Sequence, residues 1–236
     1  MSETDFFYEA YDRDDVAYGD VPSQPLAAYL AQVRPTGQAL DLGAGAGRDT
    51  ISMARAGLRV LAVDLSSRGA QRIAQRAESA GVADRVQTCV ANVCSLEIQT
   101  AAYDVICATT VLDHVPASDA ARVWAKMVHG LNAGGVIYVE VHTTEDPGCD
   151  VAPGCHSDAP TSETAGAVIN YFAPNQLVDW ATAAESQLRV LRYEERLEWD
   201  YTHGPEHQHG KAILLAVKSG THPNWYGQPA AFPRRE

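Results

Sequence analysis

ALDLGAGAGRDT, residues 39–50, is the stretch of this 236-residue chain that decides its fold. An apolar run leads directly into Gly43, Gly45 and Gly47, and the residues after them are typical of a helix start. Glycine adopts positive φ without strain and lets the backbone approach a ligand closely. The free N–H groups and positive dipole end of the following helix attract an anion. The stretch therefore predicts a strand, a ligand-binding turn and a helix, with a pyrophosphate or a carboxylate as the anion.

Short apolar runs alternate with amphipathic stretches on both sides of this turn. Such alternation is typical of βαβ units built around a parallel sheet. The predicted strands are 38–42, 59–64, 85–90, 103–109 and 136–142, and the predicted helices are 24–33, 48–56, 67–80, 118–131 and 174–184. The runs 189–199 and 211–217 predict a terminal antiparallel pair. We therefore expect a doubly wound α/β sheet with helices on both faces.

The domain organisation follows from where this pattern begins, breaks and ends. We expect an N-terminal cap, a main domain and a C-terminal tail, at residues 1–36, 37–218 and 219–236. Residues 143–172 are rich in Thr, Pro, Gly, Asp and Ser, and they are too long for an ordinary connection. We interpret them as an insertion over the active site, in the manner of a lid.

Composition limits the partners of the chain. With 18 basic and 30 acidic side chains, the formal net charge is −12, which disfavours nucleic acid and anionic membrane surfaces. No apolar run is long enough to span a membrane, and the acidic N-terminus does not resemble a signal peptide. Five cysteines without a repeated spacing are typical of free thiols. We expect a cytoplasmic protein, either a monomer or a homodimer.

Three polar residues favour S-adenosylmethionine over a dinucleotide. The spacing G-x-G-x-G departs from the dinucleotide pattern G-x-G-x-x-G. Asp41 precedes the first glycine by two residues, where it can meet a cationic amino group. Asp64 closes the next strand, where a carboxylate can accept both ribose hydroxyls, and Asn92 follows the third strand, within reach of an adenine edge.

With these residues, the chain resembles a class I S-adenosylmethionine-dependent methyltransferase over residues 37–218. The resemblance implies a Rossmann-like seven-stranded sheet, order 3-2-1-4-5-7-6, with the last strand antiparallel. It also implies which residues contact the cofactor. These are Gly43, Ala44 and Gly45 at the methionine part, Asp64 and Leu65 at the ribose, Asn92 and Val93 at the adenine, and Thr109 on the sulfonium side.

Two C-terminal segments are similar to the tellurite-resistance branch of that family. They are FAPNQLVDW (172–180) and EERLEWDYTHGPEHQHGKAILLAVK (194–218). In that branch a histidine before the last strand is assigned a catalytic role, and His203 matches it best. Arginines follow that histidine in the branch, where they meet an oxyanion, but this chain has Gly204 to His207 there. The difference argues against tellurite as the substrate.

Three segments carry histidines to the edge of the predicted sheet where the strands end: VLDHV (111–115), His142 and THGPEHQH (202–209), which we place in the turn before the last strand. Ligands of open α/β sheets bind at that edge. One interpretation makes a histidine a general base, with His203, His114 and His142 as candidates. Another places a metal there, with His142, His203, His207 and His209 as candidate ligands. A third leaves a polar hairpin with solvated histidines.

The substrate side also includes candidates other than a base or a metal ligand. Aromatic faces attract a sulfonium or an organic cation, so Tyr11 and Tyr18 of the N-terminal cap are candidates for contacting the substrate, as are Arg48 and His207. The cap aromatics could equally pack on the domain. The hypothesis is a direct transfer of methyl from the sulfonium to a small nucleophile. The alternatives are a cofactor-binding regulatory module and a non-methylating isomerase or cyclase.

Overall fold

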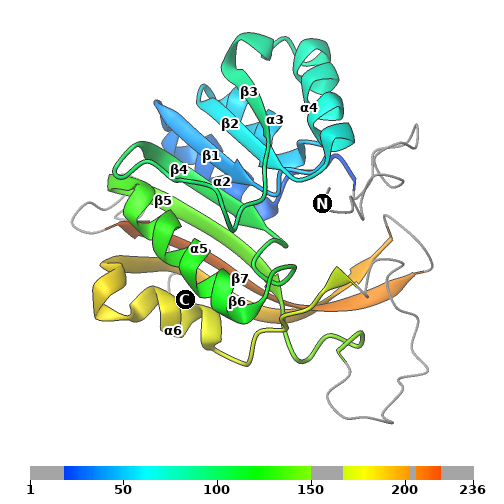
Figure 1. The fold of residues 1–236 in the computed structure, drawn as a ribbon, viewed down its shortest axis with the longest axis vertical. Helices are drawn as coiled ribbons and strands as arrows, with labels where there is room; N and C mark the ends of the chain where they lie inside the picture. The colour runs from blue at the N-terminus through cyan, green and yellow to red at the C-terminus, as the bar shows by residue number, and fades with distance from the viewer. Residues whose placement is uncertain (1–18, 150–166, 202–205, 219–236) are drawn as a thin grey trace, which may run out of the picture.

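The computed structural model describes residues 19–149, 167–201 and 206–218. They form a seven-stranded sheet of order β3-β2-β1-β4-β5-β7-β6, which confirms the predicted order (Figure 1). Strands β1 to β5 are parallel, and β7 runs antiparallel to both of its neighbours. The strands are β1 Gln38–Leu42, β2 Arg59–Asp64, β3 Val86–Val90, β4 Tyr103–Thr109, β5 Leu131–His142, β6 Leu188–Asp200 and β7 His207–Lys218.

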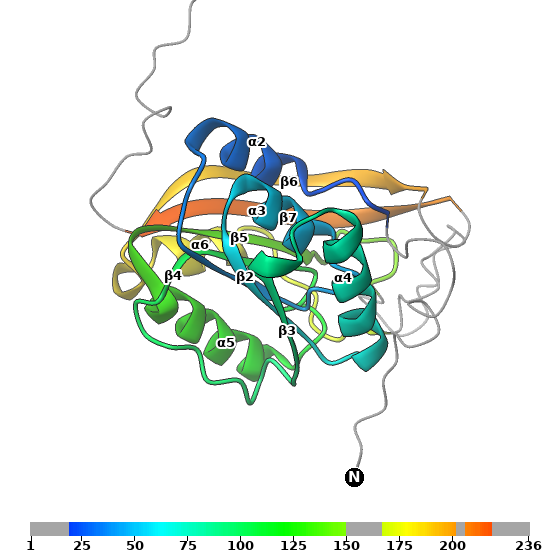
Figure 2. The ribbon, with the colours of Figure 1, turned by 90° about the horizontal axis from the view of Figure 1, so that it is seen from above.

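Helices cover both faces of the sheet, as predicted (Figure 2). On one face lie α2 (Gln24–Val33), α3 (Arg48–Ala56) and α4 (Ser67–Ser79). On the other lie α5 (Ala117–Gly130) and α6 (Gln176–Thr182). Two short 3-10 helices complete the described elements, at Ala83–Arg85 and Ala184–Ser186. Because the central strands are covered on both sides, they are apolar on both sides, which is why they read as short continuous apolar runs.

Glycine ends the first crossover helix. At Gly57 the backbone is left-handed, with φ 111°, and its N–H bonds to carbonyls of the last turn of α3. At the start of α4, the Ser66 side chain accepts a hydrogen bond from the Gly69 N–H at 3.1 Å. These caps fix the C-terminal end of α3 and the N-terminal end of α4, and the predicted bounds of both helices agree with the observed ones within one residue.

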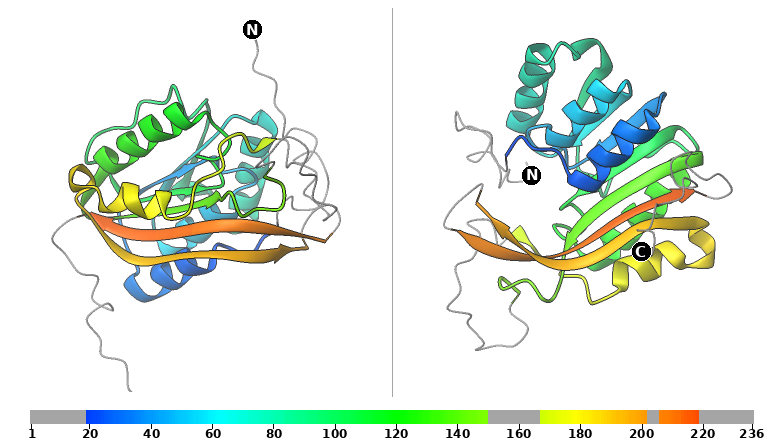
Figure 3. Two further views of the ribbon diagram at one scale, coloured as in Figure 1. Left: turned by 90° about the horizontal axis from the view of Figure 1, so that it is seen from below. Right: turned by 180° about the vertical axis from the view of Figure 1, so that it is seen from behind.

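The terminal hairpin is longer than predicted, and the expectation that residues 202–209 are a turn was wrong for its last three residues. His207 and His209 belong to β7, where they pair with Asp200 and Glu198 of β6. The last partner of β5 on β7 is Lys211, opposite His142. The hairpin therefore continues past the end of β5 (Figure 3). The sequence did not indicate this extension because its residues are polar. Where β6 and β7 pair only with each other, they bury little apolar surface and need no apolar run.

Residues 143–172 leave the sheet and return to it. Thr143 and Phe172 form an isolated parallel bridge, and the Phe172 N–H donates to the His142 carbonyl at 2.9 Å. Most of the predicted lid, 150–166, lies outside the described residues, as do the C-terminal tail and half of the N-terminal cap. The domain boundaries stay predictions. In the described ranges, no helix has the length and apolar character needed to cross a bilayer.

Replacing Gly210 by alanine is expected to destabilise the protein by about 1–3 kcal/mol. An added Cβ would lie 2.4 Å from the Asp146 backbone nitrogen, so the segment after β5 would have to move away from β7. Urea unfolding monitored by circular dichroism measures the change. An unchanged midpoint would show that this close contact between strand and loop does not exist in solution.

Candidate active site at the carboxyl edge of the sheet

The glycine turn is held to the end of β2 by one carboxylate. Asp64 Oδ2 accepts from the Gly45 N–H and Asp64 Oδ1 accepts from the Ser66 N–H, both at 2.7 Å. The turn also needs its glycines, since φ is +63°, +53° and +84° at Gly43, Gly45 and Gly47. This carboxylate is 7% exposed and, with two acceptor sites on each oxygen, can accept further bonds.

Gly43 is packed closely against another segment of the protein, the turn after β4. A Cβ at this position would lie 2.3 Å from Val111 Cγ2, in the turn after β4. The glycine therefore lets the turns after β1 and β4 meet, and this packing constraint is separate from any approach of a ligand. It brings the residues that follow β4 against the glycine turn.

Asp41 is buried inside β1, with 3% exposure, and accepts a hydrogen bond from the Thr50 hydroxyl of α3. Burial, with Asp49 nearby, raises the pKa of its carboxyl to about 7. A cation placed next to this group would favour its ionised form, as the amino group of a methionine moiety can. The sequence identified this acid, but its burial could be known only from the fold.

Arg48 is turned toward the start of α2. Its Nη2 donates to Ser23 Oγ at 3.0 Å and to Asp49 Oδ2 at 3.3 Å. The same Asp49 carboxylate accepts from the Ser23 N–H at 2.9 Å and from the Thr109 hydroxyl at 3.3 Å. Asp49 therefore joins α2, α3 and the end of β4, and Arg48 belongs to this network. A substrate contact for Arg48 stays a prediction.

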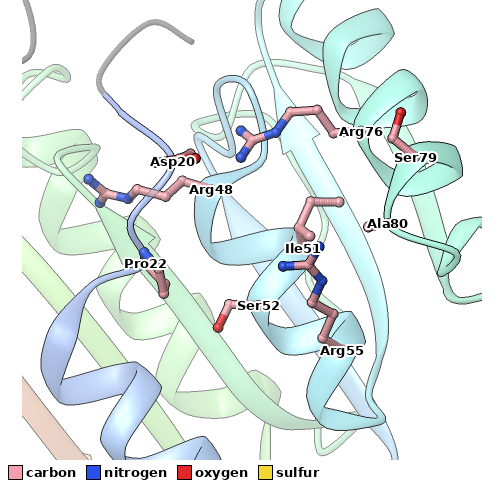
Figure 4. A pocket seen from close by; sticks show the side chains of 9 residues that line it. All are labelled: Asp20, Pro22, Arg48, Ile51, Ser52, Arg55, Arg76, Ser79 and Ala80. Atoms are coloured by element: carbon pink, nitrogen blue, oxygen red, sulfur yellow. The ribbon is translucent and has the colours of Figure 1, made fainter.

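A polar pocket of about 300 Å³ lies between the segment before α2 and helices α3 and α4 (Figure 4). Three guanidinium groups line it, from Arg48 and Arg55 of α3 and from Arg76 of α4. Arg76 Nη1 also donates to the Ala46 carbonyl in the glycine turn at 2.8 Å. The pocket therefore borders the cofactor turn from outside.

The predicted adenine side follows β2 and β3. Asn92 Oδ1 accepts from the Cys94 N–H at 2.9 Å, which fixes the side chain on the turn after β3. Val93 is buried, whereas Leu65 is 39% exposed at the end of β2. An exposed apolar side chain next to Asp64 is suited to cover a flat ring.

Two of the predicted histidines meet around a buried acid. His142 Nδ1 is hydrogen-bonded to Asp113 Oδ2, which also accepts from the His142 N–H at 3.0 Å. The His114 and His142 rings lie 6.2 Å apart, edge to face. Burial would raise the pKa of Asp113, but the adjacent His114 and His142 outweigh it and lower this pKa to about 2. Asp113 is therefore an ionised partner that fixes the His142 ring.

Asp113 Oδ1 is buried and has no hydrogen-bond partner among the described residues. Buried carboxylate oxygens are rarely left unpaired. An oxygen of this kind at a ligand-binding edge indicates that a small polar group belongs next to it. His114 itself is tied to the insertion, since its Nδ1 is 2.8 Å from the Ala167 carbonyl.

The remaining described histidines of the predicted site gather at the end of the hairpin. His207 is 1% exposed and His209 is 8% exposed, so neither of these two is a solvated side chain. Asp146 Oδ2 lies 3.0 Å from His209 Nδ1, and the His142 and His209 rings are 4.7 Å apart. Sequence reasoning missed Asp146, because it lies in a loop whose composition indicates only a lid. An acid a few residues after a strand that ends in histidine was the available signal.

Apart from Arg48, the predicted site residues fall into three groups. The cofactor candidates line the ends of β1 to β4, and His114, His142, His207 and His209 lie around the ends of β4, β5 and the hairpin. Three predicted residues lie outside the described residues: His203, Tyr11 and Tyr18. Their roles stay predictions.

Three features define the Rossmann-like class of S-adenosylmethionine-dependent methyltransferases. They are a glycine turn after the first strand, an acid at the end of the second strand and this order of strands in the sheet. Residues 39–135 match a family model described as a methyltransferase domain. The chain therefore carries a methyltransferase domain of the class that uses S-adenosylmethionine, which confirms the predicted class and cofactor.

Three solved structures with the same fold show the range of proteins that this chain resembles. TehB from Haemophilus influenzae is 19% identical, with a TM-score of 0.66, over 91% of this chain and 66% of that one. A Burkholderia thailandensis 1,6-didemethyltoxoflavin-N1-methyltransferase, solved with 1,6-didemethyltoxoflavin and S-adenosylhomocysteine, is 23% identical, with a TM-score of 0.64, over 92% and 86%. The [4+2]-cyclase SpnF is 18% identical, with a TM-score of 0.58, over 82% and 80%. At these identities the likeness establishes the fold, and it agrees with the predicted branch.

Replacing Asp41 by asparagine is expected to raise the thermal midpoint of the ligand-free protein by roughly 5 °C at about pH 8. The pKa of about 7 in the folded protein lies above the ordinary 3.8. The neutral carboxyl therefore contributes its full stability below the unfolded-state pKa of 3.8. That stability is lost as the pH rises through the folded-state pKa of about 7.

Thermal unfolding of both proteins checks this. The gain should shrink as the pH falls and vanish at about pH 3, below both pKa values, where wild-type Asp41 is largely neutral in both states. Asparagine retains an oxygen that accepts from Thr50. A variant that is less stable than wild type at the higher pH would contradict the assignment of a buried, costly carboxylate.

Proposed function

We propose that this chain transfers a methyl group from S-adenosylmethionine to a small-molecule nucleophile bound beside His142. The observation that carries the proposal is the pairing of His142 with the buried Asp113 at the same sheet edge as the glycine turn. Parallel strands bring their carboxyl ends to one edge, so a donor held by β1 to β3 and an acceptor held after β4 and β5 face one another.

The donor contacts are assigned from the ends of the first four strands. Asp41 would hold the amino group and the turn from Gly43 through Ala44 to Gly45 the methionine part. The ribose hydroxyls would meet Asp64 beside Leu65. Asn92 and Val93 would contact the adenine, and Thr109 would line the sulfonium side. Support comes from the burial of Asp41 and from the way Asp64 fixes the turn.

The acceptor side needs alignment first and a base only when the nucleophile carries a proton. A lone pair on the acceptor forms the new bond to the methyl carbon while the carbon–sulfur bond breaks, and S-adenosylhomocysteine leaves with both electrons of that bond. His142 Nδ1 is engaged by Asp113, so Nε2 is the atom available to take the acceptor's proton. Asp113 would stabilise the resulting imidazolium, because its own carboxylate stays ionised.

A small acceptor is favoured over a macromolecule by charge and by the likeness to known folds. The net charge of −12 opposes binding of a phosphate backbone. The Burkholderia protein that shares this fold is a small-molecule methyltransferase, solved with that small molecule bound. The fold also carries a cyclase, so formation of S-adenosylhomocysteine is the measurement that separates methyl transfer from other chemistry.

An acceptor screen tests the proposal directly. Purified protein with S-adenosylmethionine is incubated with thiols, chalcogen oxyanions, metalloids, amines and phenols, and S-adenosylhomocysteine is quantified. At least one class should give acceptor-dependent turnover. Binding of the donor with no turnover on any class would favour a regulatory module, and an acceptor converted without S-adenosylhomocysteine would favour an isomerase or cyclase.

Affinity for S-adenosylmethionine is expected to weaken about fivefold between pH 7 and pH 6. The carboxyl of Asp41, with its pKa raised by burial to about 7, must lose its proton before it can pair with the donor's ammonium. Calorimetric titration across this range checks the slope. Asp41→Asn should bind more weakly and lose this slope, and a wild-type affinity that is flat with pH would contradict the pairing.

His142→Asn is expected to lower turnover by about 100-fold or more with an acceptor whose nucleophilic atom carries a proton. Donor affinity should stay within about twofold, because His142 lies on the acceptor side of the proposed site. The matched control is His129→Asn, at an exposed position of α5. Equal turnover in wild type and His142→Asn would remove His142 as the base.

A further inference from the structure

Three potential metal ligands converge at the end of the β6–β7 hairpin. His207 Nε2 and His209 Nε2 lie 3.0 Å apart, and Asp200 Oδ2 lies 3.7 Å from His209 Nε2. One donor atom from each of the three residues falls within 4.8 Å of the others. Both histidines are buried, at 1% and 8% exposure, and Asp200 is partly buried, with 19% of its side chain exposed.

Strand geometry produces this convergence. His207 and His209 are two residues apart on β7, so their side chains point to the same face. Asp200 is the cross-strand partner of His207, and side chains of directly paired residues are neighbours on that face. The hydrogen-bonded register of the hairpin therefore fixes the three donors relative to one another.

The spacing of the two nitrogens fits a shared ion. Zinc–nitrogen bonds of about 2.0–2.1 Å with angles near 90–110° place two ligand nitrogens about 2.9–3.4 Å apart. A hydrogen bond between the two imidazoles would have the same length. Asp146 fixes which ring nitrogen of His209 faces the cluster, as binding of an ion requires.

Asp146 fixes the ring of His209. Its Oδ2 lies 3.0 Å from His209 Nδ1 and accepts from the Gly210 N–H at 3.1 Å, and its Oδ1 accepts from the Gly148 N–H at 2.7 Å. Metal-bound histidine commonly donates the N–H of its other ring nitrogen to a carboxylate. Asp146 is such a carboxylate, and the second nitrogen of His209 faces the cluster as a ligand.

We propose that Asp200, His207 and His209 bind a divalent transition-metal ion, with Zn²⁺ the best fit to two imidazoles and one carboxylate. Asp146 positions His209 from outside the coordination shell. Three protein ligands leave a fourth position open, and the His142 ring lies 4.7 Å from that of His209. The ion would therefore sit beside the acceptor side of the sheet edge and tie both hairpin strands to the loop after β5.

Two neighbouring clusters are weaker candidates. Asp113, His114 and His142 also have donor atoms within 4.8 Å of one another, but the Asp113 carboxylate is already the hydrogen-bond partner of both the His142 ring and the His142 N–H. In a cluster of His142, Asp146 and His209, Asp146 would have to give up its position as the hydrogen-bond partner of His209.

The test is the metal content and affinity of untagged, full-length protein. Elemental analysis after purification without added metal measures stoichiometry, and calorimetry measures Zn²⁺ affinity after dialysis against a chelator. Asp200→Asn and His207→Gln remove single ligands with little change of shape, and His129→Gln, at an exposed position of α5, is the matched control. Circular dichroism and donor binding report whether each variant is folded.

Wild type and the control should bind one equivalent of metal, and saturating Zn²⁺ should raise their thermal midpoints by about 5–10 °C. Cobalt-substituted protein should give the visible absorption of a four-coordinate site. Both ligand variants should lose the equivalent and the shift, and Asp146→Asn should weaken affinity about 10–100-fold. Wild type without saturable binding would overturn the proposal, as would folded ligand variants that keep the metal. Loss of metal in His142→Asn but not in His207→Gln would assign the ion to a neighbouring cluster and overturn this site.

Discussion

The Asp64 carboxylate is the interaction on which the donor side of this molecule depends. It accepts from Gly45 in the turn after β1 and from Ser66 at the start of α4, so it joins two βα units at their carboxyl ends. Because it is buried and charged, it must be paired, and only a turn with positive φ presents the Gly45 N–H to it. This one connection fixes the glycine turn relative to the end of β2 and the start of α4.

The acceptor side depends on the unequal lengths of the last strands. Strand β5 ends at His142, whereas the β6–β7 hairpin continues past it, and the loop after β5 folds back against Gly210 through Asp146. Buried histidines and acids therefore gather where the sheet has no further strand to cover them. Among them, the Asp113 carboxylate is stabilised by the adjacent His114 and His142. The edge combines a rigid donor side with an acceptor side rich in groups that hold protons or ions.

Most element bounds within residues 38–142 could be predicted to within one residue, because apolar periodicity and glycine caps there act locally. The exception is β5, which begins at Leu131 and not at the predicted residue 136. Asp41, Asp64 and Asn92 were identified for the same reason, since each is tied to a strand end. The hairpin extension was missed because its pairing is not local and its residues are polar. Asp146 was missed because only the returning loop and Gly210 bring it to His209. The sequence contained all these side chains but not the long-range register that makes Asp113 and His142, or Asp200 and His209, neighbours.

The central claim is that the edge tied together by Asp64 is the methyl-donor site. Calorimetric titration of S-adenosylhomocysteine into wild-type protein and into Asp64→Ala tests it most directly. We predict one site in wild type and at least about tenfold weaker binding in the variant, through loss of both the ribose contact and the hold on the glycine turn. A folded wild-type protein without saturable binding, or a variant that binds as tightly as wild type, would contradict it.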